Sequence, residues 1–267
     1  MSFLINPFWF VSAPSCLDAD ANAFLTAAGI TDPTISTAIC TLVTDMKANG
    51  TWTKMDAIYP MVGGTAATHK FNLKNPLDTN AAFRLSFSGG WTHSANGALP
   101  NGTNTFADTF YTPSTTAIQN SHHLSYYSRT NVNLTQVEIG CSTSSSNNNL
   151  LEIRTANISY FIINQNSPYA TVADTDSRAY YIANRTASNV VNGWKNGTKV
   201  ATSTTVSNAR SSAKIYIGAF NTNNLTTTLY TTKECAFATI GQGLTDGEAA
   251  ALNTAVAAFQ TSLSRNV

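Results

Sequence analysis

The titratable side chains of this sequence are few, and their spacing offers little catalytic chemistry. Glycoside hydrolysis needs two carboxylates placed on either side of the scissile bond. Glu138 and Glu152 each stand alone on a predicted strand, and the E-x-D-x-E arrangement is absent. The sequence also lacks G-x-S-x-G, H-E-x-x-H and a phosphate-binding glycine loop. We therefore predict a protein that is not an enzyme and uses no cofactor.

Two sets of residues could in principle bind a metal ion. Asp174 and Asp176 stand one residue apart in a predicted loop. Calcium prefers oxygen ligands, so the pair is a weak calcium candidate, although Asp-x-Asp pairs in loops more often cap turns. His122 and His123 are adjacent, and adjacent strand residues point to opposite faces, so they cannot easily share one ion. We expect one histidine to be buried and the other exposed, and we predict no metal site.

Glycan binding is the main alternative to a purely structural role. It needs an exposed aromatic ring to stack under a sugar, with Asn, Asp or Arg side chains for the hydroxyl groups. Aromatic residues of this kind pack more often in the core or against another subunit, and that alternative stays open for each candidate. The candidates in predicted loops are Trp91 with His93 and Asn96, Tyr169 with Asp174, and Trp194 on a hairpin.

The composition excludes several partners. Charged residues make up 11% of the 267 residues and the net charge is +1, whereas ordinary soluble domains contain roughly 25% charged residues. Such a chain has no electrostatic footprint for nucleic acid or an anionic membrane. No apolar run approaches the roughly twenty residues of a transmembrane helix, so we expect no membrane insertion. The four cysteines are far apart without C-x-x-C spacing, which favours reduced, buried thiols over a disulfide framework.

The N-terminus is rich in aromatic residues. It resembles a secretory signal at first, but it lacks a basic region, and Asn6-Pro7 interrupts its apolar run. We interpret it as an arm that docks on its own domain or on a neighbouring subunit. The residues expected to make this assembly contact are Phe3, Phe8, Trp9 and Phe10.

Helical signals follow the arm. Asp18 is placed to cap a helix that ends at Gly29. Asp32 and Pro33 are in the N-cap and N1 positions of a second helix. Residues 52–59 have apolar positions that indicate a third short helical turn. These helices are predicted to pack on the rest of the molecule.

From about residue 65 the apolar period changes to two, which is typical of strands. No long helices separate these runs, which indicates a sandwich of two facing antiparallel sheets. Asn196-Gly197 is the sharpest hairpin signal, and Thr245 with Glu248 fits a capping box that opens a C-terminal helix. The predicted strands are residues 71–73, 82–87, 124–128, 134–139, 150–153, 158–163, 179–183, 194–200, 214–220 and 236–240.

The order of elements near the C-terminus carries a resemblance. A strand ending in IGA follows the hairpin WKNGTKVATS, and after it come an apolar strand and a helix in CAFATIGQGLTDGEAAALNTAVAAFQTSL. This arrangement, over residues 179–263, resembles the end of a laminin-G-like or concanavalin A-like jelly roll. The resemblance implies that the predicted sandwich is a jelly roll.

A second resemblance covers nearly the whole chain and rests on LINPFWF, AGITDPTISTAICTLVTDMKANGTWTKMDAIYPMVGGTAATHKFNLKNPLD and AAFRLSFSGGWTHSANGALPNGTNTFADTF. These segments are similar to structural proteins of tailed bacteriophages, especially phages of Bacteroidota such as the crAss-like group. In such proteins a small helical segment precedes a laminin-G-like jelly roll, and they serve as tail, head-fibre or capsid-decorating components. The resemblance supplies no catalytic residues.

We therefore predict a mainly β, non-enzymatic virion protein that assembles through its arm, as a homotrimer and with other virion proteins. The resemblance implies assembly in the cytoplasm of the bacterial host and a final location in the virion. The alternatives are a receptor-binding, lectin-like module for host surface glycans and a polysaccharide-degrading enzyme. The predicted parts are residues 1–17, the aromatic arm; 18–62, the helical segment; 63–243, the jelly-roll sandwich; and 244–267, the C-terminal helix.

Overall fold

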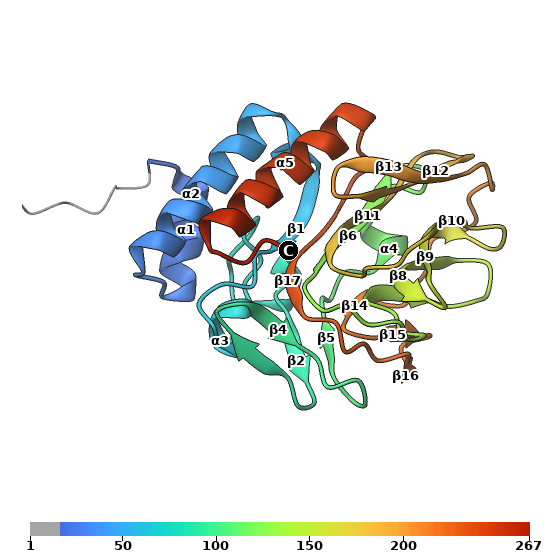
Figure 1. The fold of residues 1–267 in the computed structure, drawn as a ribbon, viewed down its shortest axis with the longest axis horizontal. Helices are drawn as coiled ribbons and strands as arrows, with labels where there is room; N and C mark the ends of the chain where they lie inside the picture. Colours follow the sequence, from blue (N-terminus) through green and yellow to red (C-terminus); the bar gives the residue numbers. More distant parts are fainter. Residues whose placement is uncertain (1–16) are drawn as a thin grey trace, which may run out of the picture.

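The computed structural model describes residues 17–267 as two antiparallel β-sheets packed face to face, with helices against the outer face of one sheet (Figure 1). The predicted jelly-roll sandwich with an N-terminal helical segment and a C-terminal helix is confirmed. The arm residues Phe3, Phe8, Trp9 and Phe10 lie outside the described residues.

The sheet that carries the helices is called the covered sheet. Strand β1 (Met55–Tyr59) belongs to it and pairs with β17. The other strands, in spatial order, are β13 (Thr198–Ser203), β12 (Val190–Lys195), β11 (Ala179–Ala187), β6 (His122–Ser128), β17 (Cys235–Gly241), β4 (Gly97–Leu99) and β3 (Thr92–Ser94).

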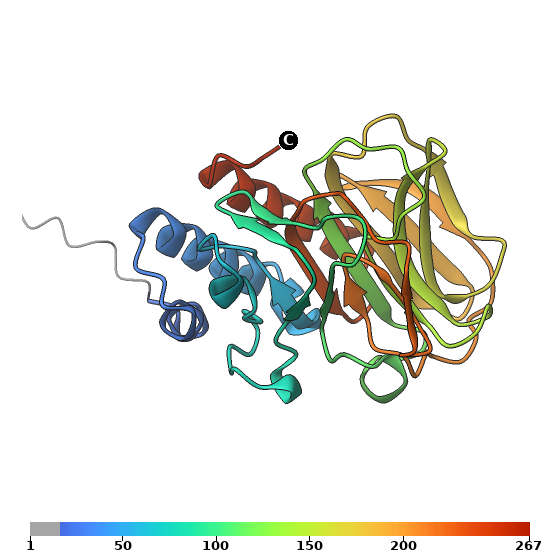
Figure 2. The same cartoon turned by 90° about the horizontal axis from the view of Figure 1, so that it is seen from below.

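The second sheet is called the open sheet, because no long helix among the described residues packs on it (Figure 2). The hairpin of β15 (Phe220–Thr222) and β16 (Thr226–Thr228) joins it beside β7. Its other strands, in spatial order, are β10 (Ala170–Ala173), β9 (Ile158–Gln165), β8 (Asn148–Thr155), β7 (Ile139–Ser142), β14 (Tyr216–Ile217), β5 (Phe106–Asp108) and β2 (Ser86–Ser88).

The core between the sheets is apolar and tightly packed. Each strand contributes alternate residues, as the pleat requires; Phe161 and Ile163 on β9 point inward, as do Tyr181 and Ala183 on β11. A side chain at Gly193 on β12 would overlap the ring of Phe161. Gly193 therefore lets the two sheets approach each other at this position.

Three long helices cover the outer face of the covered sheet: α1 (Ala19–Ala28), α2 (Pro33–Ala48) and α5 (Asp246–Ser262). Their caps are those predicted. Asp18 accepts hydrogen bonds from the first turn of α1, and Gly29 ends that helix in the left-handed conformation. Asp32 caps α2, and Thr245 with Glu248 forms the capping box of α5.

The shorter helices lie in the connections. They are the 3-10 helices η1 (Thr51–Lys54) and η2 (Asn80–Ala82) and the one-turn helices α3 (Ala66–His69) and α4 (Pro113–Thr116). None of the helices among residues 17–267 combines the length and the hydropathy needed to span a bilayer.

The prediction of a helical turn over residues 52–59 is wrong for its second half. Met55–Tyr59 is β1, which pairs with β17. Ala57 and Tyr59 point into the core between the sheets, whereas Met55 and Ile58 contact the helices. A register shift between Met55 and Ala57 breaks the strict alternation, so the apolar residues mimic a helical spacing.

The predicted strand over residues 82–87 is also largely wrong. Phe83 adopts a left-handed backbone conformation with φ of 57° at the end of η2, and only Ser86–Ser88 forms a strand. The backbone carbonyl of Phe83 accepts a hydrogen bond from the hydroxyl of Tyr59 (2.7 Å). This contact from another element fixes a conformation that the alternating sequence does not show. The predicted strand 71–73 is reduced to a single bridge between Asn72 and Asn75.

The expectation of four reduced, buried thiols is correct for only two of the described cysteines. Cys141 and Cys235 are free and buried, and burial raises the pKa of each thiol to about 12. Cys40, half-buried on α2, is disulfide-bonded. A disulfide is stable in an oxidising environment.

Candidate functional site

The outer face of the open sheet carries a cluster of aromatic side chains, which we call the aromatic face. It consists of the half-buried rings of Tyr160, Tyr169 and Phe220, packed on the buried side chains of Val137, Leu150 and Ile162. Leu150 and Ile162 are opposite each other on β8 and β9. The aromatic face therefore extends over neighbouring strands instead of lying in a single loop.

Polar groups border the two tyrosines. Their rings meet edge to face, with centroids 6.4 Å apart. The side-chain amide of Asn148 donates a hydrogen bond to the hydroxyl of Tyr169 (3.4 Å). Glu152 lies opposite Tyr160 in the strand register, and its partial burial raises the pKa of its carboxyl group. Flat apolar rings beside hydrogen-bonding groups can bind a ligand that has both apolar and hydroxyl surface.

Sequence reasoning identified Tyr169 but not Tyr160 or Phe220. Residues 158–163 of β9 are almost continuously apolar, because Phe161 and Ile163 face the core and Tyr160 and Ile162 face outward. Such a run is typical of a strand covered on both faces. The sequence therefore contained a signal for an apolar outer face, but not for which strands would share it.

A buried ion pair joins Glu138, the residue before β7, to Lys233, which lies two residues before β17. The carboxylate of Glu138 accepts hydrogen bonds from the Nζ of Lys233 (3.0 Å), the hydroxyl of Thr231 (3.0 Å) and the backbone N–H of Ile153 (2.6 Å). The side chains of both charged residues are fully buried. Burial raises the pKa of Glu138, and the Lys233 ammonium opposes that shift. Glu138 is therefore committed to a structural contact that joins residues 231–233 to the open sheet.

Trp91 and His93 lie together, as predicted, but within a half-buried cluster. Phe87 contacts both rings edge to face, at 5.4 Å from Trp91 and 4.6 Å from His93. The Nδ1 atoms of His93 and His69 are 2.9 Å apart. Asn96 is exposed in the turn between β3 and β4. The cluster fills the end of the sandwich, and Asn96 projects from the neighbouring turn.

Trp194 does not offer a surface to a sugar. Its side chain is only 5% exposed and packs in the core between the helices and the covered sheet. The Asn196-Gly197 hairpin is formed as predicted by β12 and β13. The prediction that Trp194 contacts a glycan is therefore wrong for this arrangement, because α5 packs over the strand that carries it.

The weak calcium candidates are occupied by protein groups. The carboxylate of Asp174 is buried and accepts hydrogen bonds from Lys195 Nζ (2.6 Å), Ser159 Oγ (2.7 Å) and the hydroxyl of Tyr181 (2.7 Å). Asp176 pairs with Arg178 (2.7 Å), which holds the pKa of Asp176 down to about 2. The ammonium of Lys195 thus lies where a cation would bind Asp174. Tyr169 lies on the aromatic face, away from this buried network.

The prediction for the adjacent histidines is wrong, since both are fully buried. The Nδ1 of His122 lies 3.0 Å from the carbonyl of Gly241, and the Nδ1 of His123 lies 2.6 Å from the carbonyl of Gln242. Burial lowers the pKa of His122 to about 3 and of His123 to about 4. Helices cover the outer face of β6, so both faces of this strand are in a core. Within residues 17–267, no group of three or more His, Cys, Asp and Glu side chains is placed to bind a metal ion.

A second surface feature lies in the helical layer. Three cavities follow one another between α2 and α5, and we call them together the helix groove. Their volumes are about 570, 430 and 530 Å³. Thr34 and Ser262 line both the first and the second cavity, and Ala255 lines both the second and the third.

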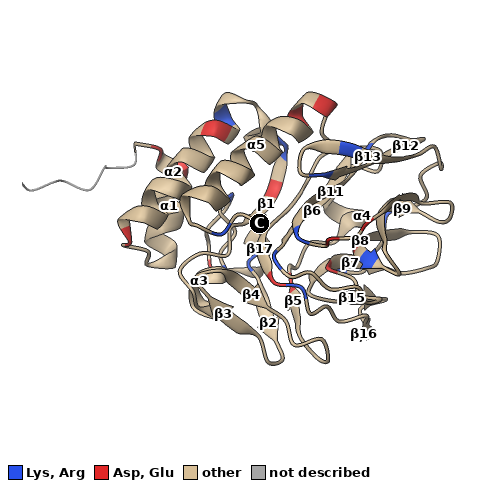
Figure 3. Cartoon of the chain, in the orientation of Figure 1, with Lys and Arg blue, Asp and Glu red and all other residues tan. Residues whose placement is uncertain are grey.

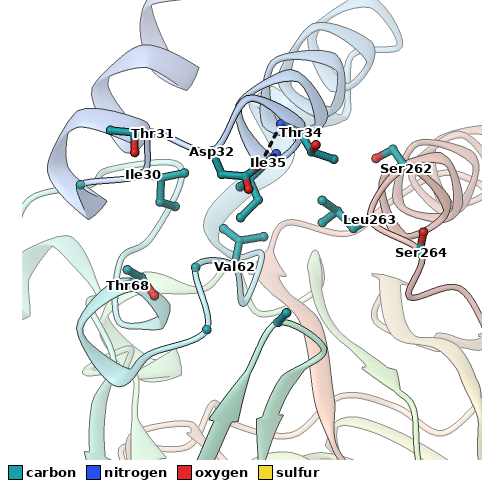
Figure 4. Close-up of a pocket in the computed structure, with 14 residues that line it drawn as sticks. Ile30, Thr31, Asp32, Thr34, Ile35, Val62, Thr68, Ser262, Leu263 and Ser264 are labelled. Carbon is teal, nitrogen blue, oxygen red and sulfur yellow. Dashed lines mark hydrogen bonds between the residues drawn. The ribbon is translucent and has the colours of Figure 1, made fainter.

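Figure 4 shows the first cavity, at the N-terminal end of α2, where side chains from separate segments converge. Ile30, Thr34 and Ile35 come from the α1–α2 turn and α2, Val62 from the loop after β1, and Leu263 from the end of α5. The carboxylate of Asp32, which also lines it, already accepts hydrogen bonds from the backbone of Thr34 (2.8 Å) and Ile35 (3.0 Å).

Arg265 anchors the residues after α5, of which Leu263 and Ser264 line this cavity. Its guanidinium is 1% exposed and donates to the carbonyls of Met61 (2.8 Å), Pro60 (3.0 Å) and Ala236 (3.1 Å). Burial lowers the pKa of Arg265 to about 10. These neutral acceptors compensate a buried charge and fix the C-terminal end of α5 to the covered sheet.

Charged side chains are sparse over the whole fold. Figure 3 shows Lys, Arg, Asp and Glu scattered singly over helices and strands. The aromatic face and the helix groove are thus mainly apolar and uncharged-polar surfaces, although Glu152 borders the first and Asp32 and Asp45 line the second.

The described residues define a jelly-roll β-sandwich with helices on the outer face of one sheet. No known protein family and no curated protein sequence matches this chain. The binding domain of botulinum neurotoxin serotype D is 10% identical, with a TM-score of 0.47 over 79% of this chain and 52% of that one. A Trypanosoma rangeli sialidase is 8% identical, with a TM-score of 0.45 over 82% of this chain and 38% of that one.

A third solved structure covers most of both chains. Domain 4 of AbnA, a GH43 extracellular arabinanase from Geobacillus stearothermophilus solved in complex with arabinotriose, is 14% identical, with a TM-score of 0.40. It covers 74% of this chain and 98% of that one. The chain spans about half or less of the toxin domain and of the sialidase.

Proposed function

We propose that this protein is a non-enzymatic structural component of a tailed-phage virion, a head-fibre, tail or capsid-decoration protein that attaches through its N-terminal arm. The observation that carries the proposal is that helices cover only one of the two outer faces of the sandwich. Helices cover one face, whereas the aromatic face of the open sheet stays accessible. The side that carries the helices is thus available for attachment to the particle, and the aromatic face is available for contact with the surroundings.

The place of Leu17, the first described residue, supports this division. The described chain begins at Leu17, which is 95% exposed, next to the cap of α1. Figures 1 and 2 show α1 at the opposite end of the molecule from β9 and β10. A protein held through residues before Leu17 would direct its aromatic face away from the particle. The disulfide of Cys40 fits a particle that persists outside the reducing cytoplasm in which it is assembled.

The state of the acidic residues supports a non-enzymatic role. Glu138 is neutralised by Lys233 and fully buried, so it cannot reach a substrate. Asp174 is bonded to Lys195, and Asp108 to Lys214 (3.0 Å). Glycoside hydrolysis needs two accessible carboxylates facing one bond, and Glu152 has no such partner in Glu138.

The proposal is tested on the phage particle itself. Mass spectrometry of particles purified from an infected culture should detect the protein at a stoichiometric level, and antibodies against it should label one location on the head or tail. Light scattering on the purified protein should give the mass of a homotrimer. Absence of the protein from gradient-purified particles, while it accumulates in infected cells, would contradict the proposal.

A second function, binding of host surface glycans, is favoured by the pairing of Tyr160 and Tyr169 beside Asn148 and Glu152. A sugar that stacked its apolar face on one of these rings would have its hydroxyl groups within reach of the side chains of Asn148 and Glu152. A glycan array on the full chain should show binding that Tyr169→Ala abolishes. The matched control is Thr261→Ala, an exposed position on α5 on the other side of the sandwich, which should leave binding unchanged.

A further inference from the structure

The helix groove runs along α2 and is lined mainly by uncharged side chains. Its α2 rim consists of small polar residues such as Thr34, Thr37 and Thr41, all of them exposed. Its α5 rim contains Ala258 and Ser262, which are also exposed. Because these side chains are short, the groove between the helices is left open to solvent at its surface.

The floor of the groove is apolar. Ala38, Leu42, Ala255 and Phe259 line it and are buried or nearly so. Among residues 17–267, the acidic or basic side chains that line it are Asp32 at one end and Asp45 at the other. Burial of an apolar segment along such a floor is favourable at about 25 cal/mol per Å² of apolar surface removed from water.

Residues 1–16 have the matching chemistry. The segment MSFLINPFWFVSAPSC contains no charged side chain, and three of its four aromatic residues are consecutive, at Phe8, Trp9 and Phe10. A charged segment would have to be desolvated to enter the groove. An uncharged, aromatic segment gains from the apolar floor and can satisfy its backbone against the threonine and serine hydroxyl groups of the rims.

The length of the segment is sufficient. Sixteen extended residues reach roughly 50 Å, whereas α2, with 16 residues, is about 24 Å long. The segment is therefore long enough to cover a groove of the length of α2 and, in addition, to span a gap of similar length between two molecules.

The starting point of the segment indicates which groove it enters. Asp18 lies two residues after this segment and forms an ion pair with Lys47 on α2 (2.7 Å). Lys47 faces α1 and does not line the groove, which lies on the α5 side of α2. The segment thus begins on the side of α2 that faces away from the groove of its own chain.

From these observations we propose that the helix groove binds residues 1–15 of a second copy of this chain. The contact is heterologous, because the arm of one copy meets the groove of the next, and such a contact closes into a ring when the rotation between copies allows it. This inference rests on the proposed attachment through the arm and names the receptor that the arm uses for self-assembly.

Full-length variants test the contact without removing any segment. The groove variant is Ala258→Arg, which places a long charged side chain on an exposed rim position. The arm variant replaces Phe8, Trp9 and Phe10 by Ser. The matched control is Thr261→Arg, because Thr261 is exposed on the same helix but does not line the groove. Each protein is studied by light scattering with known concentrations of purified protein.

We expect the wild-type chain and the Thr261→Arg control to form the same oligomer, and each of the other two variants to be monomeric or at least roughly tenfold weaker in association. An equimolar mixture of the arm variant and the groove variant should form a two-chain complex. In that mixture one chain supplies the intact arm and the other supplies the intact groove.

Three results would overturn the inference. A wild-type monomer would show that no second copy is bound, and an unchanged oligomer in Ala258→Arg would place the contact elsewhere. A mixture that stays monomeric while the wild type is oligomeric would exclude exchange of arms between copies. The virion proposal fails separately, since absence of the protein from purified particles leaves the light-scattering result untouched.

Discussion

The two outer faces of the sandwich differ in how their apolar residues are covered. Each sheet carries apolar residues on its outer face, for example Phe237 on β17 and Ile162 on β9. On the covered sheet these residues are buried by α1, α2 and α5. On the open sheet the apolar patch is small: Val137, Leu150 and Ile162 are buried, and the rings that cover them, those of Tyr160, Tyr169 and Phe220, are themselves half-buried. The covered face contributes to stability, whereas the open face keeps apolar surface available for a ligand or a neighbour.

The histidines follow the same division. His122 and His123 lie on β6 of the covered sheet, His93 lies on β3 of the same sheet, and His69 contacts His93. The strands of the open sheet contain no histidine. Conditions that protonate histidine should therefore act on the covered side of the molecule.

The largest expected effect is destabilisation by acid. Burial lowers the pKa of His69 and His122 to about 3 and that of His123 to about 4, and the pKa of His93 is lowered as well. The unfolded chain takes up these protons near pH 6.5 and the folded chain does not. The free energy of unfolding should therefore fall as pH drops from about 6.5 towards 4, by about 1.4 kcal/mol per pH unit for each fully buried histidine.

Urea unfolding at pH 7, 6, 5 and 4 measures this dependence. Hydrogen exchange at pH 5 should show loss of protection in β6 and β17 before β8 and β9. A free energy of unfolding that stays constant between pH 7 and pH 5 would contradict the burial of these histidines.

Removal of the buried cation beside the open sheet should be the next largest effect. Lys233→Met leaves the carboxylate of Glu138 buried without its ammonium partner, which should cost about 3–5 kcal/mol in the free energy of unfolding. The control is Lys214→Met, which breaks the more exposed pair with Asp108 and should cost at most about 1 kcal/mol. Equal losses in the two variants would show that the Glu138–Lys233 pair is not desolvated.

A paired truncation compares the two faces directly. Phe259 on α5 is 2% exposed and contacts Phe237 on the covered sheet, with ring centroids 5.9 Å apart. Phe259→Ala should cost about 3–5 kcal/mol. Tyr169→Ala, on the half-exposed aromatic face, should cost about 1 kcal/mol. If chemical denaturation gives the same loss for both, the aromatic face is a core and not an accessible surface.

The smallest expected effect concerns the start of the helix that covers the sheet. Thr245 Oγ1 accepts the backbone N–H of Glu248 (3.2 Å) at the N-terminus of α5. Thr245→Ala should lower the free energy of unfolding by about 1 kcal/mol. Thr254→Ala, an exposed site in the middle of the same helix, should change it by no more than about 0.5 kcal/mol. A thermal melt that does not separate the two variants would mean that the cap does not stabilise α5.

The sequence by itself determined the features that depend on near neighbours in the chain. The caps at Asp18, Asp32 and Thr245 and the hairpin at Asn196-Gly197 could be predicted, because each is a hydrogen bond or backbone preference within four residues. The sandwich itself followed from the period-two pattern. Tyr169 was identified as a candidate because its neighbours indicate a loop.

Only the tertiary structure decided which surface of each strand is covered. Met55–Tyr59 became a strand because β17 offers it a pairing edge, and Phe83 is held in a left-handed conformation by an element 24 residues away. Trp194 and His123 are buried because helices pack over strands that a sequence reads as exposed on one side. Burial of this kind depends on contacts between distant segments, and no local pattern in the chain encodes it.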